Sequence, residues 1–243
     1  MKPMGRQWFR LAWFISRCAR AGLDRPKPAA LRRAEWSHRH AIKMVRAIGM
    51  KVEVEGDPGD AHAWVGNHLG YLDVVGLATV RPVSFVAKAE VEKWPVLGGL
   101  AARSGTIFLE RERRMAVAGA TESMSSRVEQ GVPVVFFPEG TSSAGESVLP
   151  FHAPLFGPAV AQGWKVAPFA LSYEITGPAG TQAEYWGDMS FGPHFLSLLR
   201  HRTLRMRIRF GSPVRLEGDR KAIAREWHGK IGTLLQDLRG GRK

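Results

Sequence analysis

The sequence predicts an α/β fold: a mostly parallel sheet flanked by helices, with an amphipathic helical appendage at the N-terminus. From residue 51 onward, short apolar runs alternate with helical patterns, which is typical of a parallel sheet covered by helices. Before residue 50, basic and apolar residues are interleaved in two helical segments. We therefore expect basic amphipathic helices over residues 1–49 and one further domain over residues 50–243.

The first helix is expected over residues 7–20. Its aromatic residues, Trp8 and Trp13 among them, are interrupted by arginines, which is typical of a helix lying in the membrane interface. The alternative is a helix packed on the protein's own core. No apolar run reaches the length of about 18 residues that a transmembrane helix needs, so no membrane span is expected.

A second helix is expected over residues 29–48, after two prolines. It carries several basic residues together with Trp36, His38 and His40, and we expect these histidines on a solvated or interfacial basic face rather than in a ligand site. Cys18 is the only cysteine, which excludes a disulfide framework and fits a reducing compartment. Zinc-type cysteine and histidine spacings are absent from the sequence.

The rest of the chain divides into alternating elements. Strands are expected at residues 52–54, 63–65, 84–87, 106–109, 134–137, 166–171 and 204–210. Helices are expected at residues 72–80, 96–103, 114–130, 155–162, 191–200 and 220–238. The last strand alternates Met206, Ile208 and Phe210 with arginines, so one of its faces should lie in water.

The formal net charge of +13 and the pI near 10.6 predict an acidic partner. Nucleic acid, an anionic membrane, an acidic carrier protein and a phosphorylated substrate all meet this condition. The alternative is that the charge serves solubility alone.

The segment from Asn67 to Asp73 places His68 and Asp73 five residues apart at the end of a predicted strand. Ligand sites of α/β folds gather at the carboxyl ends of strands. Asp73 can accept a hydrogen bond from one ring nitrogen of His68 and leave the other nitrogen free to take a proton. His68 would then be a general base for a substrate hydroxyl, with no serine nucleophile required. A helix-capping aspartate beside an unrelated histidine is the alternative.

Two further segments follow or form predicted strands. Residues 105–111 read Gly-Thr-Ile-Phe-Leu-Glu-Arg, and residues 137–141 read Phe-Pro-Glu-Gly-Thr. A glutamate followed by glycine and a hydroxyl residue, just past a buried strand, suits a site where backbone N–H groups meet a ligand. Alone, residues 137–141 are equally typical of an ordinary turn. Their combination with the His68 segment favours a site.

In this order, the segments resemble the glycerolipid acyltransferase family, which includes the PlsC-type 1-acyl-sn-glycerol-3-phosphate acyltransferases. The Asn-His-x4-Asp block matches Asn67, His68 and Asp73. Residues 105–111 are similar to the second block, residues 137–141 match the third, and residues 166–170 resemble the apolar fourth block. The resemblance spans roughly residues 50–215. It implies a glycerol-3-phosphate acyltransferase-like fold and an acyltransferase domain over residues 50–243.

The resemblance also implies a role for each block. His68 would be the general base, and Asp73 would be its partner. The substrate would be bound by Asn67, Arg111, Glu139, Gly140 and Thr141, with Arg111 and the glutamate turn holding the polar head of the acceptor. The pocket would be shaped by Gly105, Phe108, Pro138 and Pro168.

The implied reaction moves a fatty acyl group from an acyl-carrier-protein or coenzyme A thioester to the free hydroxyl of a lyso-lipid, without a metal or other cofactor. Lysophosphatidate, or 1-acyl-sn-glycerol-3-phosphate, is the expected acceptor, and phosphatidic acid is the product. Such an enzyme would act at an anionic membrane surface. We expect a peripheral or monotopic protein on the cytoplasmic face of the cell membrane.

One departure from the family pattern concerns the acceptor. Ser142 follows Thr141 where many members carry an arginine, so one expected phosphate contact is missing. Residues 142–151 and 185–194 resemble instead a subgroup that acylates lyso-ornithine lipid. Lyso-ornithine lipid, or another lyso-aminolipid, is therefore the alternative acceptor.

A non-enzymatic basic protein that binds membranes or nucleic acid is the rival from another class. Charge alone would support it, but it gives no reason for His68, Asp73, Arg111 and Glu139 to fall at strand ends. Nucleic-acid modules usually combine basic patches with stacking aromatics on one surface. Here the aromatics concentrate near the amino end and in apolar strands, so we expect no nucleic-acid partner.

Overall fold

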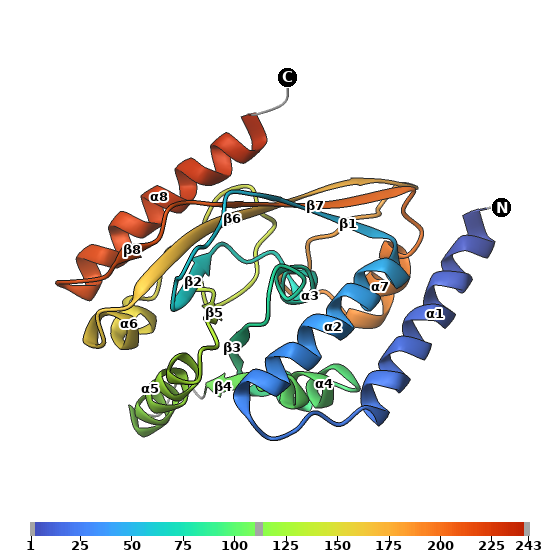
Figure 1. Cartoon of the computed structure of the whole chain (residues 1–243). Helices are drawn as coiled ribbons and strands as arrows, with labels where there is room; N and C mark the ends of the chain where they lie inside the picture. Colours follow the sequence, from blue (N-terminus) through green and yellow to red (C-terminus); the bar gives the residue numbers. More distant parts are fainter. Residues whose placement is uncertain (1–2, 110–113, 241–243) are drawn as a thin grey trace.

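A twisted sheet of eight strands forms the centre of the computed structural model, which describes residues 3–109 and 114–240 (Figure 1). The strand order is β1-β7-β6-β2-β5-β3-β4, and β8 pairs with β6. Strand β6 is antiparallel to β7 and β8, whereas all other neighbouring strands pair in parallel. The expected mostly parallel sheet is therefore confirmed.

The strands lie close to the predicted ranges. They are β1 (Met50–Glu55), β2 (Ala63–Gly66), β3 (Ser84–Lys88), β4 (Ile107–Leu109), β5 (Val134–Phe136), β6 (Lys165–Thr176), β7 (Thr203–Phe210) and β8 (Val214–Arg215). The short strand β8 was not expected from the sequence, because its two residues are too few to show any alternation.

The helices also follow the predicted order. They are α1 (Pro3–Leu23), α2 (Ala30–Ile48), α3 (Tyr71–Leu77), α4 (Leu97–Arg103), α5 (Arg114–Glu129), α6 (Gly157–Ala161), α7 (Phe191–Leu198) and α8 (Arg220–Gly240). Two short 3₁₀ helices are η1 (Ala89–Lys93) and η2 (Ala153–Phe156). The helix expected over residues 155–162 is thus shorter and is preceded by η2, because Pro158 suits the first turn of a helix but not its interior.

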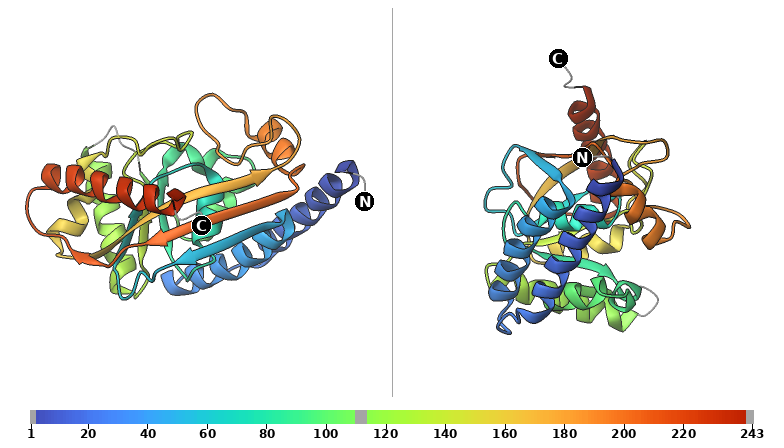
Figure 2. Two further views of the ribbon diagram at one scale, coloured as in Figure 1. Left: turned by 90° about the horizontal axis from the view of Figure 1, so that it is seen from above. Right: turned by 90° about the vertical axis from the view of Figure 1, so that its right-hand side faces the viewer.

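Helices cover both faces of the sheet (Figures 1 and 2). One hydrophobic core contains Ile48 of α2, Leu77 of α3 and Leu198 of α7. A second core lies on the other face and contains Met124 of α5, Ala159 of α6 and Trp227 of α8. Figure 2 shows α8 on one side of the strands and the α1–α2 pair on the other. Because α2 belongs to the first core, residue 49 marks a change of secondary structure within one packed body.

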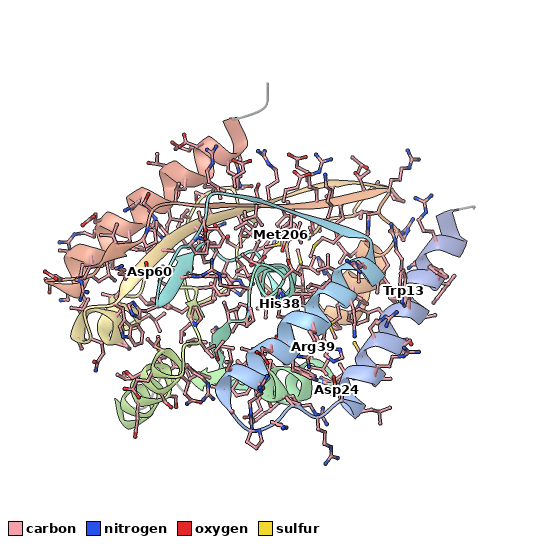
Figure 3. All side chains as sticks on the ribbon, viewed as in Figure 1. Trp13, Asp24, His38, Arg39, Asp60 and Met206 are labelled. Atoms are coloured by element: carbon pink, nitrogen blue, oxygen red, sulfur yellow. The ribbon has the colours of Figure 1, made fainter. Side chains whose placement is uncertain are left out.

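Helix α2 differs from the expectation of a solvated basic helix. Trp36 is only 2% exposed, and its indole N–H donates to the backbone oxygen of Asp24 at 2.9 Å. His40 is buried, and its Nε2 lies 2.8 Å from a carboxylate oxygen of Asp24. His38, labelled with Asp24 in Figure 3, makes a hydrogen bond through Nδ1 to the backbone oxygen of Ala78. The predicted solvated face is wrong for these residues, because they join α2 to α3 and to the α1–α2 connection.

Helix α1 has one packed face and one exposed face. Leu11 and Phe14 pack against the first core, and Cys18 is buried. Burial raises the pKa of the Cys18 thiol to about 11, which agrees with a thiol that is not a nucleophile. Trp8 and Phe9 are 57% and 59% exposed. Across the described residues, no helix combines the length and apolar character needed to cross a membrane.

The alternation predicted for β7 is confirmed, but its arginine face is only partly in water, since the Arg207 side chain is 14% exposed and donates to the backbone oxygen of Leu238 on α8. Arg207 and Arg209 both form ion pairs with Glu55 of the neighbouring strand β1, while Met206 and Ile208 on the opposite face are fully buried. The arginines of β7 are therefore used in cross-strand pairs that hold the β1–β7 edge.

Candidate active site

The carboxyl ends of β2 and β5 lie side by side because these strands are parallel neighbours, and the motif residues follow them directly. Asn67 and His68 come after β2, whereas Phe137 and Glu139 come after β5. Close packing holds the β2 end in place, since a side chain on Gly66 would lie 2.2 Å from the ring of Phe169 on β6. The glycine therefore permits β2 and β6 to approach at this point.

His68 and Asp73 form the expected pair. Nδ1 of His68 lies 2.7 Å from Oδ2 of Asp73, and the carboxylate of Asp73 is fully buried. The same oxygen accepts the backbone N–H groups of Leu69 and Gly70 at 2.6 and 2.9 Å. A carboxylate in this position fixes Nδ1 of His68 as the donor. Nε2 of His68 has no partner within the described part of the chain, and the side chain is 22% exposed.

Aromatic packing orients the imidazole. The ring of His68 stacks on Phe137, with ring centroids 4.1 Å apart and an interplanar angle of 17°. Phe137 comes from the segment after β5, so the stack joins the two strand ends. The carboxylate of Asp73 and the ring of Phe137 together leave His68 little freedom to rotate.

The loop that carries His68 is contacted by Tyr185, which lies between β6 and α7. The backbone N–H of Tyr185 donates to the oxygen of Leu69 at 2.8 Å. Gly70 has a φ of 150° at the start of α3, and a side chain there would lie 2.9 Å from Cβ of Tyr185. Glycine is therefore required at residue 70 both for its backbone angle and for this close approach.

Glu139 binds the backbone of the loop that carries His68 and does not line the adjacent cavity. Its Oε1 accepts the backbone N–H of His68 at 3.1 Å, and the residue is only 3% exposed. Its Oε2 is buried without a hydrogen-bond partner in the described residues. Burial is the main cause that raises the pKa of Glu139 to about 8, and the negative charge of Asp73 adds to it.

Asn67 also has a supporting position. Its side-chain amide donates to the backbone oxygen of Leu171 at 3.0 Å and accepts the N–H of Leu171 at 2.8 Å. The residue is 1% exposed. Both polar groups of Asn67 therefore bind β6, so the structure assigns it to positioning the loop rather than to the substrate contact expected from the sequence.

An apolar cavity of about 430 Å³ adjoins His68. Helices α2, α3 and α4 contribute to its lining through Met44, Leu72, Leu100 and other apolar side chains. Aromatic residues from three segments lie near its other sides, namely Phe137, Trp94, Tyr185 and Phe191. Polar groups line it at Lys88, Thr141 and Ser142. An apolar volume with a few polar groups beside one base is suited to a fatty chain carrying a reactive end.

The pocket residues predicted from the motifs do not line this cavity. Neither Gly105 nor Phe108 reaches it, although their neighbours Thr106 and Leu109 do. Phe137 lines the cavity, whereas the neighbouring Pro138 does not. Pro168 of β6 lies against Gly211 and is also absent from the lining. Gly140 and Thr141 do line the cavity as expected. The motif blocks locate the cavity, but not all of their residues reach it.

Three further residues bear on the site: Arg111, Lys88 and Tyr173. Arg111, predicted to hold the acceptor head, lies outside the described residues. Lys88 was not singled out from the sequence, although it ends a buried strand, which is the position where ligand-facing residues gather. Tyr173 was also missed, and its hydroxyl donates to Oδ1 of Asp73 at 2.6 Å. No sequence pattern connects Tyr173 to Asp73, because the contact depends on which strands are neighbours.

Comparisons with known proteins show the family to which the chain belongs. Residues 57–172 match the family described as Acyltransferase. A lyso-ornithine lipid O-acyltransferase of Brucella abortus is 36% identical over 217 residues, which cover 82% of this chain and 81% of that protein. The chain belongs to the acyltransferase family.

Two further acyltransferases extend the comparison. A 1-acyl-sn-glycerol-3-phosphate acyltransferase of Neisseria meningitidis is 32% identical over 187 residues, covering 74% of this chain and 72% of that protein. The crystal structure of the 1-acyl-sn-glycerophosphate acyltransferase PlsC from Thermotoga maritima matches over the full length of both chains, with a TM-score of 0.66 and 18% identity. The acyltransferase fold is thus shared, including the N-terminal helices.

Because the pKa of Glu139 is raised, the free energy of unfolding should depend on pH. The folded protein keeps a proton on Glu139 up to about pH 8, whereas the unfolded chain releases it near the ordinary value of 4.5. The free energy of unfolding should therefore be highest at low pH for this group and decline as the pH rises through that window. Glu139→Gln keeps an acceptor and cannot ionise, so it should lack a decline on the order of 4 kcal/mol.

Urea unfolding at pH 5 to 9 measures this difference. Glu146→Gln is the matched control, because Glu146 is an exposed glutamate in the same connection. Equal pH slopes for the parent and Glu139→Gln would show that Glu139 titrates normally.

Proposed function

We propose that this acyltransferase moves a fatty acyl group from an acyl thioester to the free hydroxyl of a lyso-lipid. One observation carries the proposal: the unpartnered Nε2 of His68 lies beside an apolar cavity of about 430 Å³, while Nδ1 is held by the buried Asp73. The base and the volume for a fatty chain are therefore adjacent.

The proposed reaction begins when the acceptor hydroxyl lies within hydrogen-bond reach of Nε2 of His68. Nε2 takes the hydroxyl proton as the oxygen attacks the thioester carbonyl, and Asp73 stabilises the imidazolium that forms. The tetrahedral intermediate then collapses, the carbon–sulfur bond breaks, and the thiolate takes the proton from His68. An ester and a free thiol result. The step needs neither an oxidant nor a cofactor.

Backbone groups beside His68 can stabilise the oxyanion. Thr141 and Ser142 line the cavity, and their N–H groups have no acceptor among the residues that the structure describes. Preorganised N–H donors of this kind stabilise the negative charge that develops on a carbonyl oxygen. Lys88 also lines the cavity and supplies a cation that can hold an anionic group of either substrate.

The donor is proposed to be an acyl-carrier-protein or coenzyme A thioester. Both carriers are acidic, and the formal net charge of the chain is +13. Opposite net charges increase the rate at which two such molecules meet. Nucleic acid is not proposed as a partner. Nucleic-acid binding would call for a surface on which bases stack. The structure instead provides an apolar cavity beside His68, and the exposed aromatics of α1 lie on a helix that we assign to membrane contact.

For the acceptor, the observations favour a lyso-aminolipid of the ornithine type. Ser142 lines the cavity where many acyltransferases carry an arginine for a phosphate, and the Brucella abortus relative acts on lyso-ornithine lipid by name. Lysophosphatidate is the second candidate, because the exposed ammonium group of Lys88 could bind its phosphate and the Neisseria meningitidis relative carries that activity in its name.

His68→Ala should lower kcat by roughly 10²–10⁴, the range typical of a lost general base. Asp73→Asn should cost less, since that side chain orients the base without taking the proton itself. His228→Gln is a suitable control, because His228 lies on α8 and bonds to the backbone of Val148 away from the cavity. Transfer of a labelled acyl group to a lyso-lipid measures the effect, and a fully active His68→Ala protein would overturn the mechanism.

The acceptor prediction can be tested with a pair of substrates. The parent protein should acylate lyso-ornithine lipid faster than lysophosphatidate when each is supplied with the same labelled thioester. Ser142→Arg should shift the ratio of kcat/KM toward lysophosphatidate by about tenfold, because an arginine–phosphate contact is charge-assisted. Thin-layer chromatography separates the two products. A preference of the parent for lysophosphatidate would reverse the assignment.

We also propose that α1 rests on an anionic membrane at the cytoplasmic face, as a peripheral attachment. Its exposed Trp8 and Phe9 lie among arginines, the combination that binds the interface of acidic bilayers. The other face of α1 packs on the protein, so the helix can present these residues in a fixed orientation.

The double variant W8S/F9S should sediment with vesicles of phosphatidylglycerol and phosphatidylcholine roughly tenfold less than the parent, since it loses two large apolar side chains from the interface. Both side chains are more than half exposed, so the fold should persist. Val54→Ser is the control, because Val54 is also exposed but lies on the edge strand β1 rather than on α1. Equal sedimentation of W8S/F9S and the parent would remove α1 from the proposed attachment.

A further inference from the structure

One hydrogen bond at the catalytic pair comes from outside the sequence motifs. Oδ2 of Asp73 already accepts three donors, which are Nδ1–H of His68 and the N–H groups of Leu69 and Gly70. The second carboxylate oxygen, Oδ1, accepts the hydroxyl of Tyr173 at 2.6 Å. Tyr173 lies on β6, the neighbour of β2 in the sheet, and is 100 residues from Asp73 along the chain.

We infer that Tyr173 is a positioning residue of the His68–Asp73 pair, an inference that rests on the function proposed for that pair. Tyr173 is the donor that the structure gives to Oδ1, so both carboxylate oxygens of Asp73 are hydrogen-bonded only when Tyr173 donates. With Oδ1 held by Tyr173, the carboxylate cannot rotate away from the ring of His68. Without the hydroxyl, Oδ1 would be buried and unpartnered in a residue that is fully inaccessible to solvent.

Tyr173 acts as a neutral donor throughout the working pH range. Burial, followed by the negative charge of Asp73, raises the pKa of Tyr173 well above its ordinary value. Glu184 and Tyr71 are the other titratable groups that act on it, and both raise the pKa further. The phenol therefore keeps its proton, so Tyr173 neither supplies nor removes a proton in the reaction. Its effect on His68 passes through the charge and orientation of Asp73.

A purely structural role is the alternative. Tyr173 also packs against the first core, and its hydroxyl lies 3.9 Å from the sulfur of Met206, the methionine labelled between the sheet and α3 in Figure 3. Loss of packing alone would lower stability without changing how the His68 ring binds protons. The titration of the ring therefore separates the two roles. Glu139 titrates near His68 as well, so the ring itself must be observed rather than activity alone.

The experiment uses Tyr173→Phe in the full chain, which removes one hydroxyl and keeps the ring. The charge of Asp73 is then less satisfied and attracts the imidazolium more strongly, so the midpoint of the His68 titration, followed by NMR of the ring, should move to higher pH. The acid limb of the kcat/KM profile should move in the same direction. At the parent's optimum, kcat should fall about tenfold with a smaller change in KM.

A double-mutant cycle with Asp73→Asn provides the decisive control. If Tyr173 acts through the carboxylate, Tyr173→Phe should not move the His68 midpoint in the Asp73→Asn background. Glu174→Gln is the matched strand control, because Glu174 is the next residue of β6 and pairs with Arg205 and Arg207 of β7 rather than with the catalytic pair. Glu174→Gln should leave the midpoint and the profile unchanged.

Failure of the Tyr173 role and failure of the proposed acyl transfer give different results. An unmoved His68 midpoint in Tyr173→Phe, or an equal shift in the Asp73→Asn background, would overturn the role of Tyr173 even if the parent acylates a lyso-lipid. Failure of the parent to acylate any lyso-lipid would overturn the proposed function. The ring titration needs no substrate, so it still reports whether Tyr173 controls His68 in that case.

Discussion

The buried carboxylate of Asp73 is the constraint on which the rest of the site depends. An isolated charge at a fully inaccessible position would cost several kcal/mol, and four hydrogen-bond donors offset that cost here. Three of the donors come from the loop after β2, and the fourth comes from β6. The carboxylate therefore holds the loop in its observed shape, and it also directs the imidazole of His68 toward the cavity. One interaction set supports both the local backbone and the chemistry.

Buried hydrogen bonds from Asn67 and Glu139 also fix the position of this loop. Asn67 is bound by both of its polar groups to the backbone of Leu171, and Glu139 accepts the N–H of His68. These residues belong to the motif blocks, yet they do not reach into the cavity. Their role is to place a base at the adjacent ends of parallel strands. A site built on strand ends keeps its geometry without help from the substrate.

The sequence predicted the order and type of the longer elements, because amphipathic helices and apolar strands between turns have recognisable patterns. The short β8, η1 and η2 were not predicted, because they contain too few residues to show a pattern. The sequence also located His68 and Asp73, whose short spacing keeps them in one loop. It could not locate Tyr173, because that contact requires the lateral order of strands, which no local pattern encodes. The burial of Trp36 and His40 was missed for a related reason. Their basic neighbours indicated a solvated helix, but the buried contacts with Asp24 and the cavity lie on the other side of α2.

Because helix α2 lines the cavity, the N-terminal region cannot be removed without changing the acyl-binding volume. Met44 and Ile48 belong to it, and both line the cavity, so this N-terminal region is part of the container that encloses the fatty chain. Shortening the protein at residue 49 to improve its handling in solution would open that container to water. Substitutions along this helix offer instead a way to change the size of the acyl group that fits, while the reacting atoms at the strand ends stay untouched.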